Sequence, residues 1–169
     1  MRLYPSQDPV RDGLIVAAVL AVLAAGWFGF SWASAASDSN LSFGRERDVS
    51  LTAAESGLVT LHTVDHRTAT RDLAAWDSVA TGALLGDLSG DRVGHLERTK
   101  QGEVVSTARL VRAAVVELDA YAGTARVIAV LDVSVATKDG TPSQRHRRLN
   151  ADLTRTAEGW RIAAVEAAA

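Results

Sequence analysis

The hydrophobic pattern divides the chain sharply near its N-terminus. Residues 13–33 contain no charged side chain, and the stretch from Leu14 to Phe30 is apolar throughout. A helix rises ~1.5 Å per residue, so about 20 such residues cross the ~30 Å hydrocarbon layer of a bilayer. The pattern therefore predicts a short N-terminal tail over residues 1–12 and a transmembrane helix over residues 13–33.

After the apolar run the pattern becomes polar and then helical. Residues 34–48 are rich in serine and charge, which is typical of a juxtamembrane linker or of a frayed helix start. From residue 49 apolar side chains return at helical spacing, with Ser50 as a candidate N-cap, and we expect helices over residues 49–100. Two apolar stripes carry this prediction: Leu51, Ala54, Leu58 and Leu61, then Leu73, Trp76, Ala80 and Leu84.

Beyond residue 104 the pattern has the period of strands. Valine, isoleucine and threonine become frequent, and turn sequences at residues 119–123 and 138–142 separate about four strands over residues 104–166. Helices followed by consecutive hairpins predict an α+β domain over residues 49–169, with helices packed on an antiparallel sheet. One strand has a clear apolar face, formed by Ala125, Val127, Ala129, Leu131, Val133 and Val135.

The end of the apolar run allows two interpretations. Small residues from Ala33 to Ala35 form a sequence that a signal peptidase accepts, which would make the run a cleaved signal. The run is longer than the apolar core of a signal peptide, about 7–15 residues, and this length favours a retained anchor. Trp27 and Trp32 also suit an anchor, because indole rings are enriched at the membrane interface.

The orientation of the anchor follows weakly from charge. Arg2 and Arg11 precede the span, while Arg45 and Arg47 follow it, so the positive-inside rule gives a tie. The free amino terminus and the short distance of Arg11 from the span favour a cytoplasmic N-terminus. We therefore expect a single-pass protein of the cell membrane with an extracytoplasmic C-terminal domain.

Composition excludes several classes of function. The net charge is −2, with acidic and basic residues interspersed, so we expect no nucleic-acid partner. Cysteine is absent. A disulfide framework, a thiolate nucleophile and a zinc ribbon are therefore excluded, and the domain depends on its hydrophobic core.

Three short motifs occur in the soluble part. They are Val64-Asp65-His66-Arg67-Thr68, Thr81-Gly82 and Glu158-Gly159-Trp160-Arg161-Ile162. With the anchor and the order of elements, they resemble the Mce-associated membrane proteins of actinobacteria over nearly the whole chain. Two positions depart from that family: His66 replaces an aromatic residue, and Leu85-Gly86-Asp87-Leu88 replaces a Phe-x-x-x-Tyr sequence.

The resemblance implies both a fold and a role. The fold is a cone of the nuclear transport factor 2 type, in which a curved antiparallel sheet wraps around helices. The role is that of a non-catalytic accessory or scaffold subunit of an Mce-type lipid-import system, acting through contacts with other envelope transport-complex subunits and without a cofactor. A weaker resemblance, to the periplasmic cores of type IV secretion subunits, implies an anchored subunit of a secretion-type apparatus.

Few residues of the soluble part point to chemistry. His62 and His66 have the spacing of a zinc pair on a helix, but no third ligand is placed by the sequence. An isomerase of this fold would need a carboxylate inside the cone, and Asp132 lies on the face opposite the apolar one. We expect no enzyme and no metal. The alternative is a cone pocket that binds or isomerises a small apolar ligand, with His66, Trp76 and Asp132 as candidate lining residues.

One basic cluster, Arg145 to Arg148, lies in a predicted strand. On a strand, Arg145 and Arg147 face one way while His146 and Arg148 face the other. Such charges protect a sheet edge from pairing with another chain. The sharper hypothesis is that Arg145, Arg147 and Arg148 contact an acidic partner surface or the phosphates of lipid headgroups.

Overall fold

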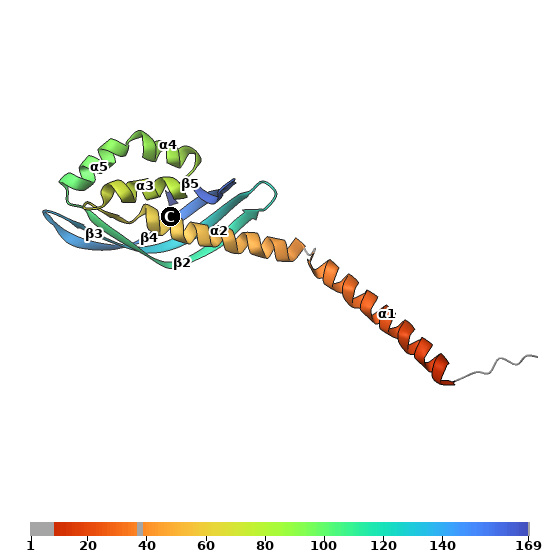
Figure 1. Ribbon diagram of the computed structural model, residues 1–169. Coiled ribbons are helices and arrows are strands. Elements are labelled where there is room, and N and C mark those ends of the chain that lie inside the picture. The colour runs from red at the N-terminus through yellow and green to blue at the C-terminus, as the bar shows by residue number, and fades with distance from the viewer. Residues whose placement is uncertain (1–8, 37–38, 169) are drawn as a thin grey trace, which may run out of the picture. The chain divides into compact units, whose positions relative to one another are not determined.

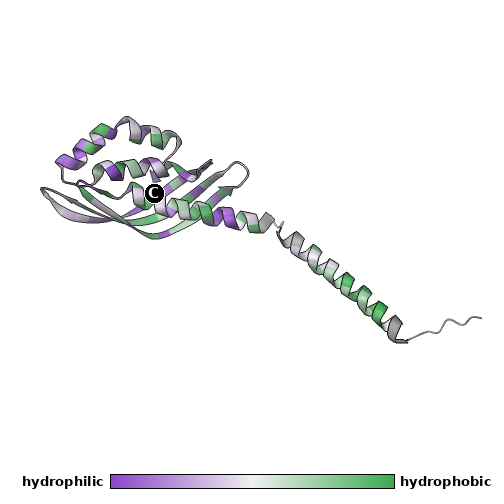
Figure 2. Cartoon of the chain, in the orientation of Figure 1, coloured by the Kyte–Doolittle hydropathy of each residue, from purple (hydrophilic) through white to green (hydrophobic). Residues whose placement is uncertain are grey.

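The apolar run forms helix α1, Pro9–Ala36. The computed structural model describes residues 9–36 and 39–168, so most of the tail expected over residues 1–12 lies outside the described residues (Figure 1). Within α1 the stretch Gly13–Trp32 is long and apolar enough to cross a membrane, as its colouring in Figure 2 shows. Trp27 and Trp32 are exposed. The chain separates into two units, residues 1–42 and 43–169, of which the second holds the sheet.

Helix α2, Ser39–Leu61, begins earlier than the sequence pattern indicates. The linker expected over residues 34–48 is helical in its described residues. Ser50 is not an N-cap: it is fully buried inside α2, and its hydroxyl donates to a backbone carbonyl one turn earlier. The early start has a tertiary cause, because Glu46 accepts a hydrogen bond from the Trp160 indole at 3.0 Å and so holds this part of α2 on the sheet.

Three shorter helices and one short strand follow. They are β1 (Val64–Asp65), α3 (Ala69–Val79), α4 (Gly82–Gly90) and α5 (Arg92–Gln101). The second apolar stripe does not run through one helix, because the chain leaves α3 to bridge the last strand. The Thr81 N–H donates to the Ile162 carbonyl at 2.8 Å, and Gly82 then has φ +57°, which only glycine adopts without strain.

The sheet is an antiparallel meander. Its longer strands are β2 (Val105–Asp119), β3 (Thr124–Thr137), β4 (Gly140–Thr156) and β5 (Gly159–Ala167). The order is β1-β2-β3-β4-β5, so the short β1 adds a fifth strand to the four expected. Register shifts interrupt the ladders, two of them between β2 and β3, and bulges of this kind bend a sheet. The α+β class, the consecutive hairpins and the curved sheet are confirmed.

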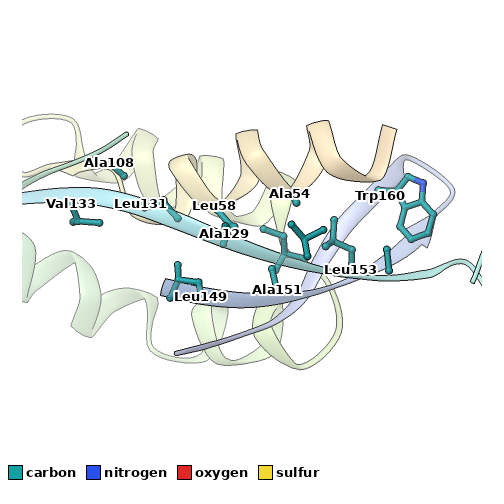
Figure 3. Close-up of a cluster of buried hydrophobic side chains, with 13 residues drawn as sticks. Ala54, Leu58, Ala108, Ala129, Leu131, Val133, Leu149, Ala151, Leu153 and Trp160 are labelled. Carbon is teal, nitrogen blue, oxygen red and sulfur yellow. The ribbon is translucent and has the colours of Figure 1, made fainter. Parts of the chain in front are cut away.

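All helices of the second unit lie on one face of the sheet, here called the inner face (Figure 1). The expected apolar face of β3 is part of it, with Val127 and Leu131 fully buried. Helix α2 packs directly on this face (Figure 3), and Gly57 makes the close approach possible. A Cβ added at Gly57 would lie 2.8 Å from the Ile162 Cδ1 atom. The opposite face of the sheet, here called the outer face, is covered by no helix of this unit.

Candidate interaction surface

The interior of the cone is filled by side chains. Leu58 from α2 meets Leu131, Leu153 and Ile162 from three strands, and all four are fully buried (Figure 3). A site for a small apolar ligand needs a concave space lined by such groups. Three hollows in the described part of the chain lie elsewhere, two of them lined by residues of β2, β3 and β4 and one between α2 and α3. In the described residues, the space between α2 and the sheet is filled by apolar side chains.

The three candidate pocket residues lie in three different places. The Trp76 indole donates to the Thr60 carbonyl at 3.0 Å and packs in a second small core with Leu73. His66 follows β1, where its backbone N–H donates to the Val104 carbonyl at 2.9 Å. Asp132 belongs to the outer face of β3. The structure therefore brings none of these side chains together around a shared cavity.

The histidine pair expected on one helix face is separated by the end of α2 at Leu61. The His62 ring lies 2.9 Å from the Leu58 carbonyl, so it caps the last turn of the helix. His66 lies beyond β1 and 3.6 Å from an Asp65 carboxylate oxygen. Among the described residues, no group of three or more His, Asp or Glu side chains is placed to hold a metal ion.

Asp132 is a paired carboxylate on the outer face. Arg109 of β2 donates to it at 3.0 Å, and His146 of β4 contacts its other oxygen, so both neighbouring strands supply a partner. The Arg109 hydrogen bond lowers the pKa of Asp132, and the His146 contact acts in the same direction. A general base needs a pKa raised toward neutrality. The structure thus makes Asp132 an ionised group that joins three strands.

A second row of charges crosses the outer face nearer the other end of the strands. Arg126 of β3 donates to Asp152 of β4 at 2.7 Å and lies 3.7 Å from Glu117 of β2. Exposed ion pairs of this kind each contribute about 0–1 kcal/mol, so they add little to the stability of the fold. Between the two rows lies an open hollow of about 420 Å³, whose outer-face lining residues are Arg112, Ala114, Ile128, Val130 and Arg148.

The basic cluster lies where β4 extends past its neighbour β5. Arg145 is opposite Val133 and Arg147 is opposite Leu131, so both arginines belong to the inner face, yet both are exposed. Arg148 projects from the outer face. In the described part of the chain, none of these three guanidinium groups forms an ion pair. The cluster is therefore a free positive charge on an exposed part of the sheet.

Two further groups of contacts differ in how far apart their residues lie in the sequence. Glu46 of α2 accepts a hydrogen bond from the Trp160 indole and lies 3.2 Å from Arg155. Arg155 lies on β4 and Trp160 on β5, both more than a hundred positions later in the chain. No local pattern signals that triad. The Asp65–Arg67 pair, by contrast, joins residues two positions apart, with the Arg67 guanidinium 2.6 Å from the carboxylate. That hydrogen bond lowers the pKa of Asp65 to about 2.

Comparison with known proteins identifies the fold and no family. No protein-family model and no curated protein matches the sequence. An IcmL-like type IV secretion system protein from Legionella pneumophila is 10% identical, with a TM-score of 0.56 over 70% of this chain and 88% of the other. The periplasmic domain of DotI is 18% identical, with a TM-score of 0.56 over 70% and 91%. The intermembrane space region of the chloroplast protein ARC6 is 19% identical, with a TM-score of 0.50 over 70% and 90%.

These similarities confirm one part of the expected resemblance. The second unit has the cone fold of the nuclear transport factor 2 type, as the matched domains do. At identities below one fifth, the matches establish the fold alone. None of the structures named here is an Mce-associated protein, so a role in lipid import stays a prediction.

Proposed function

We propose that this protein is a membrane-anchored, non-catalytic subunit of a cell-envelope assembly of the secretion type. In this proposal α1 is a retained anchor with a cytoplasmic N-terminus, and the cone domain lies outside the cytoplasm, where it contacts other subunits. The observation that carries the proposal is the side-chain-filled cone interior in a chain whose N-terminal helix is long enough to cross a membrane. A domain whose described interior is filled by side chains offers its surface for binding.

The comparisons support the secretion-type role more than lipid import. Two of the three similar structures are a type IV secretion system protein and the periplasmic domain of DotI. Both have the same cone fold as this chain. Asp132, the one carboxylate of β3 and the residue considered for an isomerase-like role, is paired on the outer face, which argues against that role.

The orientation is testable because the chain has no cysteine. Tyr121 lies in the β2–β3 turn and is 99% exposed, so Tyr121→Cys offers a single thiol on the cone domain. We expect a membrane-impermeant maleimide to label this thiol in intact cells. The matched variant Ser6→Cys, in the N-terminal tail, should react only after permeabilisation. The reverse labelling pattern would contradict the orientation. An intact protein mass that corresponds to a chain starting at Ala36 would contradict the retained anchor.

The role itself is testable by co-purification. Full-length protein is extracted from native membranes after mild crosslinking, and the partners are identified by mass spectrometry. We expect subunits of a secretion-type envelope apparatus. Recovery of the permease and substrate-binding subunits of a lipid importer would instead favour the Mce-type role, and recovery of the protein alone would refute the scaffold role.

A further inference from the structure

Strand β4 has an edge that the rest of the described chain leaves free. β4 runs over Gly140–Thr156, but its pairing with β5 starts only at Leu149. Gly140 and residues 143–148 pair with β3 on one side. On their other side no described strand pairs with them, and only the Arg148 carbonyl accepts a backbone hydrogen bond, from Ala168. Every residue of this segment is exposed. A long exposed edge of this kind is a template for pairing with another chain.

The other two edges of the sheet are protected. β1 pairs only with Val105 and Ser106 of β2, and the remainder of β2 carries two bulges in its ladder with β3, which interrupt a regular row of backbone groups. On the free side of β5, Ala80 forms an isolated bridge with Ile162, and the Thr81 N–H donates a hydrogen bond to the Ile162 carbonyl. The β4 segment therefore differs from the other edges in lacking a covering chain or a repeated bulge.

Backbone groups of the β4 segment point away from β3 at alternate residues. The Ala168 N–H donates to the Arg148 carbonyl at 3.0 Å, so the backbone of Arg148 is directed to the β5 side. In an antiparallel ladder successive residues point alternately to the two neighbours. Gln144 and His146 consequently direct their N–H and C=O groups to the free edge. These groups can accept and donate the hydrogen bonds of one additional strand.

The side chains at the same edge define the charge of its partner. Arg145 and Arg147 project from the inner face two residues apart, and Arg148 projects from the outer face. None of them has an ion-pair partner among the described residues. A strand added beside β4 would bring its own alternate side chains opposite these arginines, where opposite charges are favourable and like charges are not.

We propose that the segment Gln144–Arg148 is a docking edge at which an extended acidic segment of a neighbouring subunit adds to the sheet as a further strand. The carboxylates of that segment, on alternate residues, pair with Arg145 and Arg147, and its backbone pairs with the edge-directed groups of Gln144 and His146. This inference rests on the proposed function, because it identifies where the assembly partner binds.

Charge also argues against two other occupants. A second copy pairing antiparallel about this cluster would place arginines against arginines, which is unfavourable across a strand pair. Lipid phosphates would satisfy the guanidinium groups, but they offer no extended backbone for the free edge. An acidic peptide satisfies both the charges and the backbone groups.

The test is peptide binding to the full-length protein in phosphatidylcholine nanodiscs. The probe is a short fluorescent peptide in which glutamate alternates with valine, and its binding is followed by anisotropy. We expect the double variant Arg145→Glu/Arg147→Glu to bind about tenfold more weakly, since each exposed ion pair is worth up to about 1 kcal/mol. Addition of the peptide should also slow amide exchange at Gln144 and His146.

A second pair of variants isolates the backbone contribution. Gln144→Pro removes one edge-directed N–H without changing charge, and we expect about fivefold weaker binding from a hydrogen bond worth about 1 kcal/mol. Gln144→Ala is the matched control and should bind as the natural chain does. Circular dichroism of each variant verifies that the fold is retained.

Several results would overturn the docking edge. One is equal binding of a peptide with N-methylated backbone, because such a peptide cannot add as a strand. Others are the absence of peptide binding, arginine-dependent binding to phosphatidylglycerol vesicles alone, and a dimer that Gln144→Pro dissociates. If the peptide does not bind but secretion subunits still co-purify, only the docking edge fails. If the peptide binds but no subunit co-purifies, the proposed function fails.

Discussion

Leu58 tests whether the cone interior is a packed core. Its side chain is fully buried between α2 and the sheet, in one cluster with Leu131 and Leu153. Leu58→Ala removes three carbons, which at about 0.8 kcal/mol per buried methylene costs about 2.4 kcal/mol. A residual cavity of roughly 50 Å³, at ~24 cal/mol per Å³, adds about 1.2 kcal/mol. We expect the free energy of unfolding to fall by about 3–4 kcal/mol.

The assay is urea unfolding of the full-length protein in detergent micelles, followed by far-ultraviolet circular dichroism. Val49→Ala is the matched control, because Val49 lies on the same helix and is 50% exposed. It should change the free energy of unfolding by less than about 0.5 kcal/mol. A loss below about 1 kcal/mol for Leu58→Ala would mean that the interior is loosely filled, and the argument against a ligand cavity would then fail.

Two glycines and one ion pair provide further tests. Gly57→Ala forces a Cβ against Ile162, so we expect the free energy of unfolding to fall by about 1 kcal/mol. Gly44 has open space around it, so Gly44→Ala should raise the free energy of unfolding by about 1 kcal/mol. Equal shifts in the two variants would disprove the close packing at Gly57. The pKa of Asp65 is lowered from 3.8 to about 2. The Asp65–Arg67 pair therefore stabilises the folded state fully above pH 3.8, and this stabilisation is lost as the pH falls to about 2. Asp65→Asn should flatten a stability curve in that interval, and an unchanged curve would refute a contribution from the pair.

The strand region was predictable because its signal is local. In β3 alternate apolar residues from Ala125 to Val133 encode which side is buried, and the Asp139-Gly140 turn marks where the chain reverses. Both expectations agree with the register of β3 and β4. Helix boundaries were less predictable, because α2 starts early through the Glu46–Trp160 contact and α3 ends early where Thr81 binds Ile162. Those partners are remote in sequence.

The candidate interaction surface was also predictable only in part. The alternation of the basic cluster on a strand, and the position of Asp132 on the polar face, follow from the period of two. Their partners do not. Arg109 and His146 meet Asp132 only because the register of three strands places them in one row. Likewise, Arg145 and Arg147 are known to lie beside a free edge only once β5 is seen to pair from Leu149 onward.

The sequence by itself determined that an apolar span without charges precedes an α+β domain with hairpin-linked strands, because chain-local periodicity and turn chemistry suffice for such features. Only the tertiary structure decided that the cone is filled, that His66, Trp76 and Asp132 lie apart, and that β4 presents an unpaired edge. The physical reason is that burial and pairing depend on contacts between residues distant in the chain, such as Leu58 with Ile162.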